Sequence, residues 1–124
     1  METPFRTRGH PMAYDKSLEL RIETLITEWP DVEKKRMFGG VCYLLHGNIC
    51  CGIWQDLLIV RTTPEQAGLL LQGEHVRPFD VTGRPMKGWL MVAPSGLTAD
   101  AELLAWLETG RDFVLTLRPK PVHA

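Results

Sequence analysis

The chain lacks the features that mark membrane-spanning, secreted or disulfide-stapled proteins. Its 124 residues contain no run close to the ~20 apolar residues of a membrane span. The N-terminal stretch has arginines but no apolar core of the kind a secretory signal needs. Three cysteines are an odd number, poor for a disulfide framework and in keeping with a reducing compartment. We therefore expect a cytoplasmic protein with no membrane contact.

An excess of charge of one sign is also missing. The sequence has 14 Lys and Arg residues against 15 Asp and Glu residues, a formal net charge of −1. Autonomous DNA-binding modules usually carry a basic excess, because neutralising phosphates supplies much of their affinity. The balance disfavours direct nucleic-acid binding by the chain alone and leaves room for a local basic patch.

Motifs of known catalysis and ligand binding are absent as well. Neither Ser17 nor Ser95 stands in a G-x-S-x-G nucleophile elbow. No histidines form H-E-x-x-H, and Cys42 and His46 on one strand would lie ~13 Å apart, too far to hold one ion. The glycines match neither the phosphate-loop nor the dinucleotide pattern. We therefore assign no catalytic, metal-binding or cofactor-binding residue.

The composition that is present fits one globular domain. Hydrophobic residues make up 44% of the chain and charged residues 23%, which are ordinary globular values. We expect residues 1–13 to be a flexible extension because they show no apolar periodicity, with Met12 as an alternative start. Residues 14–118 form the single domain, and residues 119–124 form a tail.

Helices are predicted where an N-cap residue precedes apolar side chains at helical spacing. They are residues 16–29 after Asp15, residues 64–71 after Thr63, and a last helix from Thr98 with Leu103, Leu107, Val114 and Leu117 on one side. Thr63, Pro64 and Gln66 read as a capping box. Gly110 either weakens the last helix by up to ~1 kcal/mol relative to alanine or allows close packing.

Strands are predicted where short apolar runs lie between turn residues. They are Arg36–Phe38, Val41–His46, Ile49–Trp54, Leu57–Val60, His75–Phe79 and Trp89–Val92. The order is α-β-β-β(-β)-α-β-β-α. Consecutive hairpins make the sheet mainly antiparallel, so we expect an α+β two-layer domain with flanking helices.

The central hairpin has apolar residues on both faces. A two-residue turn at Gly47-Asn48 would put one set of side chains under the helices: Cys42, Leu44, Ile49, Cys51, Ile53, Leu58 and Val60. The second face would carry Val41, Cys50 and a candidate interaction surface made of Tyr43, Leu45, Trp54, Leu57 and Ile59. A helix of the same chain, a twin subunit or another protein must cover that face.

The cysteines are expected to be core thiols. Cys50 and Cys51 are adjacent rather than spaced as C-x-x-C, and neighbouring strand residues point to opposite faces, so the two thiols should diverge. The alternative is a small thiol-dependent or ligand-binding enzyme that uses Cys50 or Cys51. Such an enzyme requires a solvent-accessible thiol with a lowered pKa.

A locally basic segment runs from Thr82 to Trp89. Arg84, Lys87 and Trp89, with Arg77 nearby in sequence, could bind an anion or a partner's carboxylate. The plainer interpretation is a tight turn whose cations are solvated. A further alternative is an accessory nucleic-acid-binding module that uses Arg77, Arg84 and Lys87.

Four pieces of sequence together resemble the TfoX N-terminal domain family. They are Met12-Ala13-Tyr14-Asp15, Lys35-Arg36-Met37-Phe38-Gly39-Gly40-Val41, Gly47-Asn48-Ile49-Cys50-Cys51-Gly52 and Thr82-Gly83-Arg84-Pro85-Met86-Lys87-Gly88-Trp89. The resemblance spans about residues 12–119. It implies a small α+β domain similar to the type III secretion-chaperone fold.

The resemblance also bears on function. The namesake members of the family regulate natural competence in bacteria, act with a transcription activator and carry a second domain that resembles helix-hairpin-helix DNA binders. This chain ends before such a domain. We therefore expect a bacterial, non-enzymatic, regulatory domain that works through a protein partner or as a homodimer.

Overall fold

The computed structural model describes residues 14–37, 39–80 and 86–120. The expected extension over residues 1–13, the strand residue Phe38 and the basic residue Arg84 lie outside these ranges. No helix among the described residues has the length and apolar character needed to cross a membrane.

A six-stranded sheet forms the centre of the fold. Its strands are β2 (Val32–Met37), β3 (Gly40–Leu45), β4 (Asn48–Trp54), β5 (Leu57–Arg61), β6 (Val76–Pro78) and β7 (Trp89–Val92). They lie in the order β2-β3-β4-β5-β7-β6, and each described pair is antiparallel. The predicted antiparallel sheet is confirmed.

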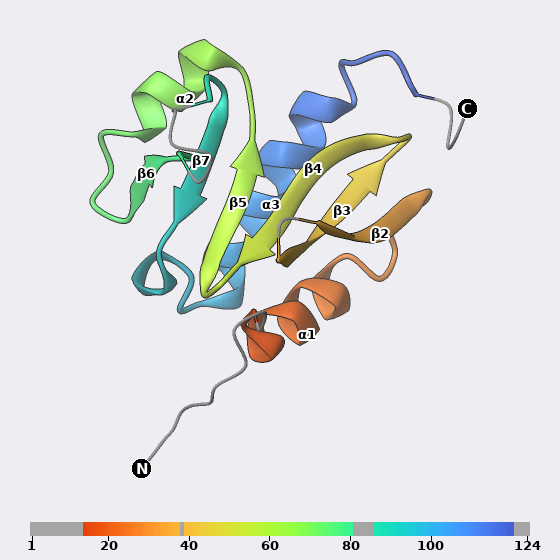
Figure 1. The fold of residues 1–124 in the computed structure, drawn as a ribbon, viewed down its shortest axis with the longest axis horizontal. Coiled ribbons are helices and arrows are strands. Elements are labelled where there is room, and N and C mark those ends of the chain that lie inside the picture. Colours follow the sequence, from red (N-terminus) through yellow and green to blue (C-terminus); the bar gives the residue numbers. More distant parts are fainter. Residues whose placement is uncertain (1–13, 38, 81–85, 121–124) are drawn as a thin grey trace.

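Two helices pack on the same face of this sheet. α3 (Asp100–Val114) crosses behind β4 and β5 in Figure 1, and α1 (Lys16–Leu25) packs against α3. The short helix α2 (Pro64–Leu70) lies beside β7 and β6, at the end of the sheet. The protein is therefore an α+β domain with one layer of sheet and one of helices, as the sequence predicts.

Side-chain caps fix two of the helix starts. The carboxylate of Asp15 accepts the N–H of Leu18 at 3.0 Å, and the hydroxyl of Thr63 accepts the N–H of Gln66 at 3.1 Å. Both predicted caps are confirmed. The cap predicted at Thr98 is wrong: the N-cap is Ala99, whose N–H donates to the carboxylate of Glu102 at 3.0 Å.

The first helix is shorter than the predicted 16–29. It ends at Leu25, because Ile26 leaves helical geometry with φ −103° and ψ 14°. A tight turn follows, in which the N–H of Trp29 donates to the carbonyl of Ile26 at 2.9 Å. Pro30 disfavours helical geometry at the residue before it, and Asp31 with φ 60° then turns the chain into β2.

The β3–β4 turn lies one residue earlier than predicted. His46 and Gly47 occupy it with φ values of 51° and 81°, the positive values that a two-residue type I′ turn requires. Asn48 instead begins β4 opposite Leu45, where it is buried and its amide donates to the carbonyl of Arg118 at 3.1 Å. The predicted Gly47-Asn48 turn is therefore wrong.

This shift changes the face that β3 presents. A one-residue slip moves every side chain of a strand to the other face. Tyr43 and Leu45, predicted on the interaction surface, are buried with Val41 under α1 and α3, whereas Cys42 and Leu44 face the other way. The predicted helix-side placement of Cys51, Ile53, Leu58 and Val60 is confirmed, because a bulge opposite Tyr43 and Leu44 takes up one extra residue of β4. The predicted faces of Ile49 and Cys50 are wrong, since Cys50 lies in the core under the helices and Ile49 does not.

A charged cluster attaches α1 to β2 and β3. The ammonium of Lys34 lies 2.7 Å from a carboxylate oxygen of Glu19 and 2.6 Å from one of Glu23. The hydroxyl of Tyr43 donates to Glu23 at 2.8 Å, and that of Tyr14 donates to Glu19 at 2.9 Å. The hydrogen bonds from Lys34 to Glu19 and Glu23 raise the pKa of Lys34, so its ammonium group stays protonated around neutral pH.

α3 closely approaches the backbone of β4 at Gly110. A Cβ at this position would collide with the carbonyl oxygen of Cys50 and lie 3.2 Å from its carbonyl carbon. Gly68 in α2 is the opposite case, because in the described part of the chain no atom beyond its own helix and its chain neighbours lies within 4 Å of the position of its missing Cβ. The close-packing explanation for Gly110 is therefore correct.

We predict opposite effects for alanine at these two helix glycines. Gly110→Ala should lower the free energy of unfolding by about 1–3 kcal/mol, because the strain of overpacking outweighs the gain in helix propensity. Gly68→Ala should raise it by up to about 1 kcal/mol, since only the propensity changes. Urea denaturation of the two variants and of the wild type measures both changes in the free energy of unfolding. Equal stability of the Gly110→Ala variant and the wild type would contradict the close approach of α3.

Candidate functional site

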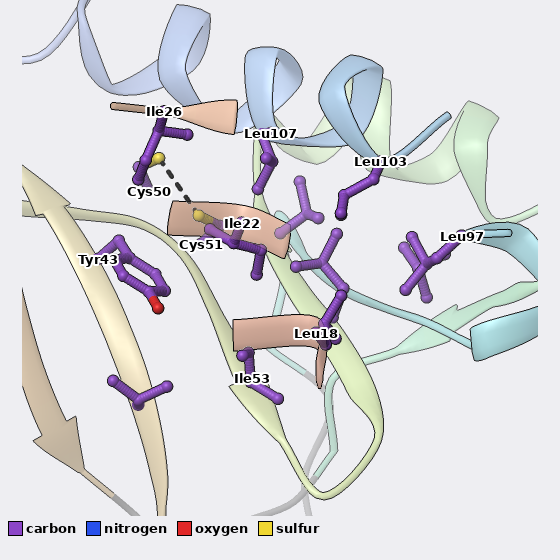
Figure 2. Close-up of a cluster of buried hydrophobic side chains, with 14 of the residues drawn as sticks. Leu18, Ile22, Ile26, Tyr43, Cys50, Cys51, Ile53, Leu97, Leu103 and Leu107 are labelled. Carbon is purple, nitrogen blue, oxygen red and sulfur yellow. Dashed lines mark hydrogen bonds between the residues drawn. The ribbon is translucent and has the colours of Figure 1, made fainter. Parts of the chain in front are cut away.

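The adjacent cysteines meet instead of diverging. The bulge in β4 turns the side chain of Cys50 to the helix side of the sheet, where Cys51 already points. Their sulfur atoms lie 3.7 Å apart, joined by the dashed line in Figure 2, in the core cluster that also includes Ile26, the residue after α1, and side chains of α3. The prediction that the two thiols point to opposite faces is therefore wrong.

Burial makes all three thiols poor nucleophiles. Cys42, Cys50 and Cys51 are free thiols and at most 1% exposed, as the sequence predicts for core cysteines. Burial raises the pKa of Cys42 from 9.0 to about 11. The hydrogen bond from Cys50, together with burial, raises the pKa of Cys51 well above its ordinary value. A reactive cysteine requires the opposite, a lowered pKa and access to solvent.

The predicted interaction surface on the sheet is largely covered by the chain itself. Leu57 is 5% exposed and Ile59 is 1% exposed, both packed in a cluster with Phe79 and Met91. Trp54 packs against the same cluster and is partly buried. With Tyr43 and Leu45 in the core, Trp54 is the member of the predicted surface that keeps appreciable exposure.

The predicted basic residues remain at the surface. Arg77 in β6 and Lys87 ahead of β7 are exposed, whereas Trp89 is partly buried. Lys87 and Trp89 lie in one short segment, residues 86–89, beside α2, and Arg77 lies on the edge strand of the same end of the sheet. Arg84 lies outside the described residues, so its predicted role stays a prediction.

A concave site lies where α2 meets this segment. We call it the α2 hollow: a depression of about 530 Å³ lined by α2 and Leu71, by Pro78 of β6 and by residues 86–89. Its walls are mostly apolar, and Glu65 and Lys87 contribute the charged groups. Sequence reasoning singled out Lys87 and Trp89 and missed the α2 side, because nothing local indicates which helix will lie against the segment.

A second depression lies between α2 and α3, and His75, one of its lining residues, forms a polar pair with Ser95 that sequence reasoning also missed. The hydroxyl of Ser95 lies 2.8 Å from Nδ1 of His75, and Nε2 of His75 lies 3.8 Å from a carboxylate oxygen of Glu74. The amide N–H groups of Gly96 and Leu97, which follow Ser95, donate to the carbonyls of Ala93 and Pro94. They are therefore not available to stabilise an oxyanion beside Ser95.

The described residues bring no metal centre together. No group of three or more His, Cys, Asp or Glu side chains within residues 14–37, 39–80 and 86–120 is placed to hold an ion. The site that emerges from the geometry is thus the α2 hollow and the exposed cations near it.

Comparison with protein-family models finds one that matches this chain. The family model for the TfoX N-terminal domain matches residues 24–113, most of the chain. The protein belongs to the TfoX N-terminal domain family. The resemblance carried by the sequence motifs is confirmed, and the matched region of this TfoX N-terminal domain includes the whole α2 hollow. No curated protein and no solved structure matches the chain.

We predict that the thiols of this TfoX N-terminal domain react with a thiol reagent only after unfolding. In the native protein at neutral pH, Cys42, Cys50 and Cys51 should show no fast reaction, because all three side chains are buried away from the reagent. All three should react at once in denaturant. Quantifying the released chromophore from a disulfide reagent with and without denaturant measures the difference. Rapid native labelling of Cys50 or Cys51 would restore the thiol-enzyme alternative.

We also predict a loss of stability in alkali that depends on Cys42. Its folded pKa is raised from 9.0 to about 11, so the folded state holds this proton more tightly than the unfolded state. The stabilisation is complete below the unfolded pKa and falls as pH rises toward the folded one, by at most about 1.4 kcal/mol per pH unit.

Urea denaturation between neutral pH and the pKa of Cys42 tests this, with Cys42→Ala as the control for all other titrating groups. The free energy of unfolding of the wild type should fall more steeply than that of the variant. Parallel pH profiles would show that burial leaves the Cys42 thiol unperturbed.

Proposed function

We propose that this TfoX N-terminal domain is a non-enzymatic regulatory domain of the bacterial cytoplasm that acts by binding another protein. Membership of the family supports a domain of the kind found in competence regulators. The regulatory role, the partner and the location are proposals that go beyond membership.

The observation that carries the proposal is the burial of the thiols. Cys50 and Cys51, the best candidate nucleophiles of the sequence, are packed between the sheet and α3 with no more than 1% of their surface exposed. Groups placed in this way contribute to packing rather than to chemistry with a substrate. A domain that acts through surface contacts with another protein does not need reactive thiols.

The edges of the sheet favour a different protein over a twin subunit joined by extending the sheet. The outer strand β2 carries Lys34, Lys35 and Arg36, and the opposite outer strand β6 has three residues and includes Pro78. Charged residues, proline and short length are the devices that keep sheet edges from pairing. A contact through exposed side chains near β6, such as Arg77, fits these edges better.

Complementation of a deletion tests the proposal. In the organism of origin, the gene is deleted and the transcript profile is compared after return of the wild type or of a Cys42→Ala, Cys50→Ala, Cys51→Ala triple variant. We expect the triple variant to restore the profile, because a contact domain does not need the thiols. Thermal denaturation checks that the triple variant is folded. If it is not, the three single variants are tested for complementation in its place.

A matched pair of charge reversals tests the contact surface. Arg77 and Lys35 are exposed cations at the two ends of one row across the sheet, through Cys42, Gly52, Ile59 and Met91. Arg77→Glu should fail to restore the transcript profile, whereas Lys35→Glu should restore it. Failure of folded thiol-free variants would instead identify a thiol-dependent activity and end the proposal.

A further inference from the structure

The α2 hollow has the size and lining of a small-molecule site. Its volume of about 530 Å³ lies within the ~300–1,000 Å³ of ordinary ligand pockets, and most such pockets are apolar with a few polar groups. Pro78, Met86 and Trp89 supply apolar wall, and Met86 is 38% exposed although it is a large hydrophobic residue. An apolar ligand would bury surface that water now contacts.

Gly68 keeps the hollow open at a cost to the helix. Glycine in a helix interior is destabilising by about 0.5–1 kcal/mol relative to alanine. Gly68 stands inside α2 and lines the hollow, yet among the described residues no neighbouring atom lies within 4 Å of the place where a Cβ would be. Packing within the domain therefore does not require a glycine here, whereas a ligand seated against the helix would.

The opposite wall is fixed in place. The carbonyl of Gly88 accepts the N–H of Thr62 at 2.7 Å, and Gly88 has φ +83°. A Cβ on Gly88 would lie 2.6 Å from the carbonyl oxygen of Thr62. The N–H of Met86 donates to the carbonyl of Phe79, and that of Trp89 donates to the carbonyl of Met86. A wall held by these bonds exists before any ligand arrives, which lowers the ordering cost of binding.

Lys87 supplies the charged group of this wall. Lys87 lines the hollow, and among the described residues no carboxylate lies within ion-pair distance of it. The guanidinium of Arg61 stacks over Trp89 at 5.1 Å from the ring centre and likewise has no described carboxylate partner. Glu65 contributes a negative charge from the α2 side. A ligand with one anionic group would therefore place it toward Lys87, away from Glu65.

We propose that the α2 hollow binds a small carboxylate with an apolar body about the size of an aromatic ring. The apolar body lies against α2 at Gly68 and against Trp89, and the carboxylate pairs with Lys87. Such a site would make the domain responsive to a metabolite, a property beyond the proposed binding of a protein partner.

Titration by NMR tests the proposal on the full chain. The probes are 3-phenylpropionate, its neutral amide 3-phenylpropanamide and the cation 3-phenylpropylamine, each raised to about 10 mM, where even a millimolar ligand fills most sites. We expect 3-phenylpropionate to shift the backbone amides of α2 and of residues 86–89. The neutral amide should bind on the order of tenfold more weakly, because a charge-assisted hydrogen bond is lost.

Two variants with matched controls locate the site. Gly68→Leu fills the hollow with a side chain that suits a helix, and Ala101→Leu adds the same side chain at an exposed position of α3. Lys87→Glu reverses the charge at the hollow, and Lys35→Glu does so on the far edge strand. Gly68→Leu should abolish the shifts and Lys87→Glu should weaken binding at least about tenfold, while both controls bind as the wild type does.

Several outcomes would overturn the proposal. Absence of any shift in α2 and residues 86–89 would show that the hollow does not take this ligand class. Equal binding of carboxylate and amide, or tighter binding of the amine, would remove the role of Lys87. Unchanged binding by the folded Gly68→Leu variant would place the ligand elsewhere.

These results are separate from those that test the proposed function. Ligand binding is measured on the isolated chain with Gly68 and Lys87 variants, whereas the regulatory role is measured in the cell, by restoration of the transcript profile with thiol-free and Arg77 variants. Either proposal can therefore fail while the other stands.

Discussion

The approach of α3 to β4 at Gly110 is the constraint on which much of the domain depends. Because this residue has no side chain, the helix backbone reaches the carbonyl of Cys50 and lies low on the sheet. At the same place, the bulge in β4 turns the side chain of Cys50 toward the helix, where it lies beside Cys51. The two thiols are thereby enclosed in the core that Leu103 and Leu107 of α3 complete (Figure 2).

The two helix glycines show how the same residue serves different ends. Gly110 faces backbone, so any side chain there must displace the helix from the sheet. Gly68 faces open space, and its missing side chain forms part of a hollow whose other wall is held by Gly88 and Thr62. The first glycine brings two layers together, and the second leaves room between a helix and a fixed segment.

Local signals predicted the elements well where the deciding interaction is itself local. The caps at Asp15 and Thr63 bond to amides three residues away, and β7 has the predicted bounds from Trp89 to Val92. The turn after β3 was predicted wrongly, because His46-Gly47 and Gly47-Asn48 both suit a tight turn. In the observed register, the side-chain amide of Asn48 donates a hydrogen bond to the carbonyl of Arg118, 70 residues away in the sequence. The bulge then returned Cys51 and Ile53 to their predicted face and moved Cys50 away from its predicted one.

The sequence by itself determined the α+β class, the antiparallel sheet, the order of elements, the core character of the cysteines and the family. These follow from periodicity, turn residues, caps and motifs, which act over a few neighbouring positions. The tertiary structure decided which face β3 presents, that Cys50 and Cys51 meet, and that α2 forms a hollow with Lys87 and Trp89. Each of these depends on contacts between segments far apart in the chain, whose geometry is set only when the helices pack on the sheet.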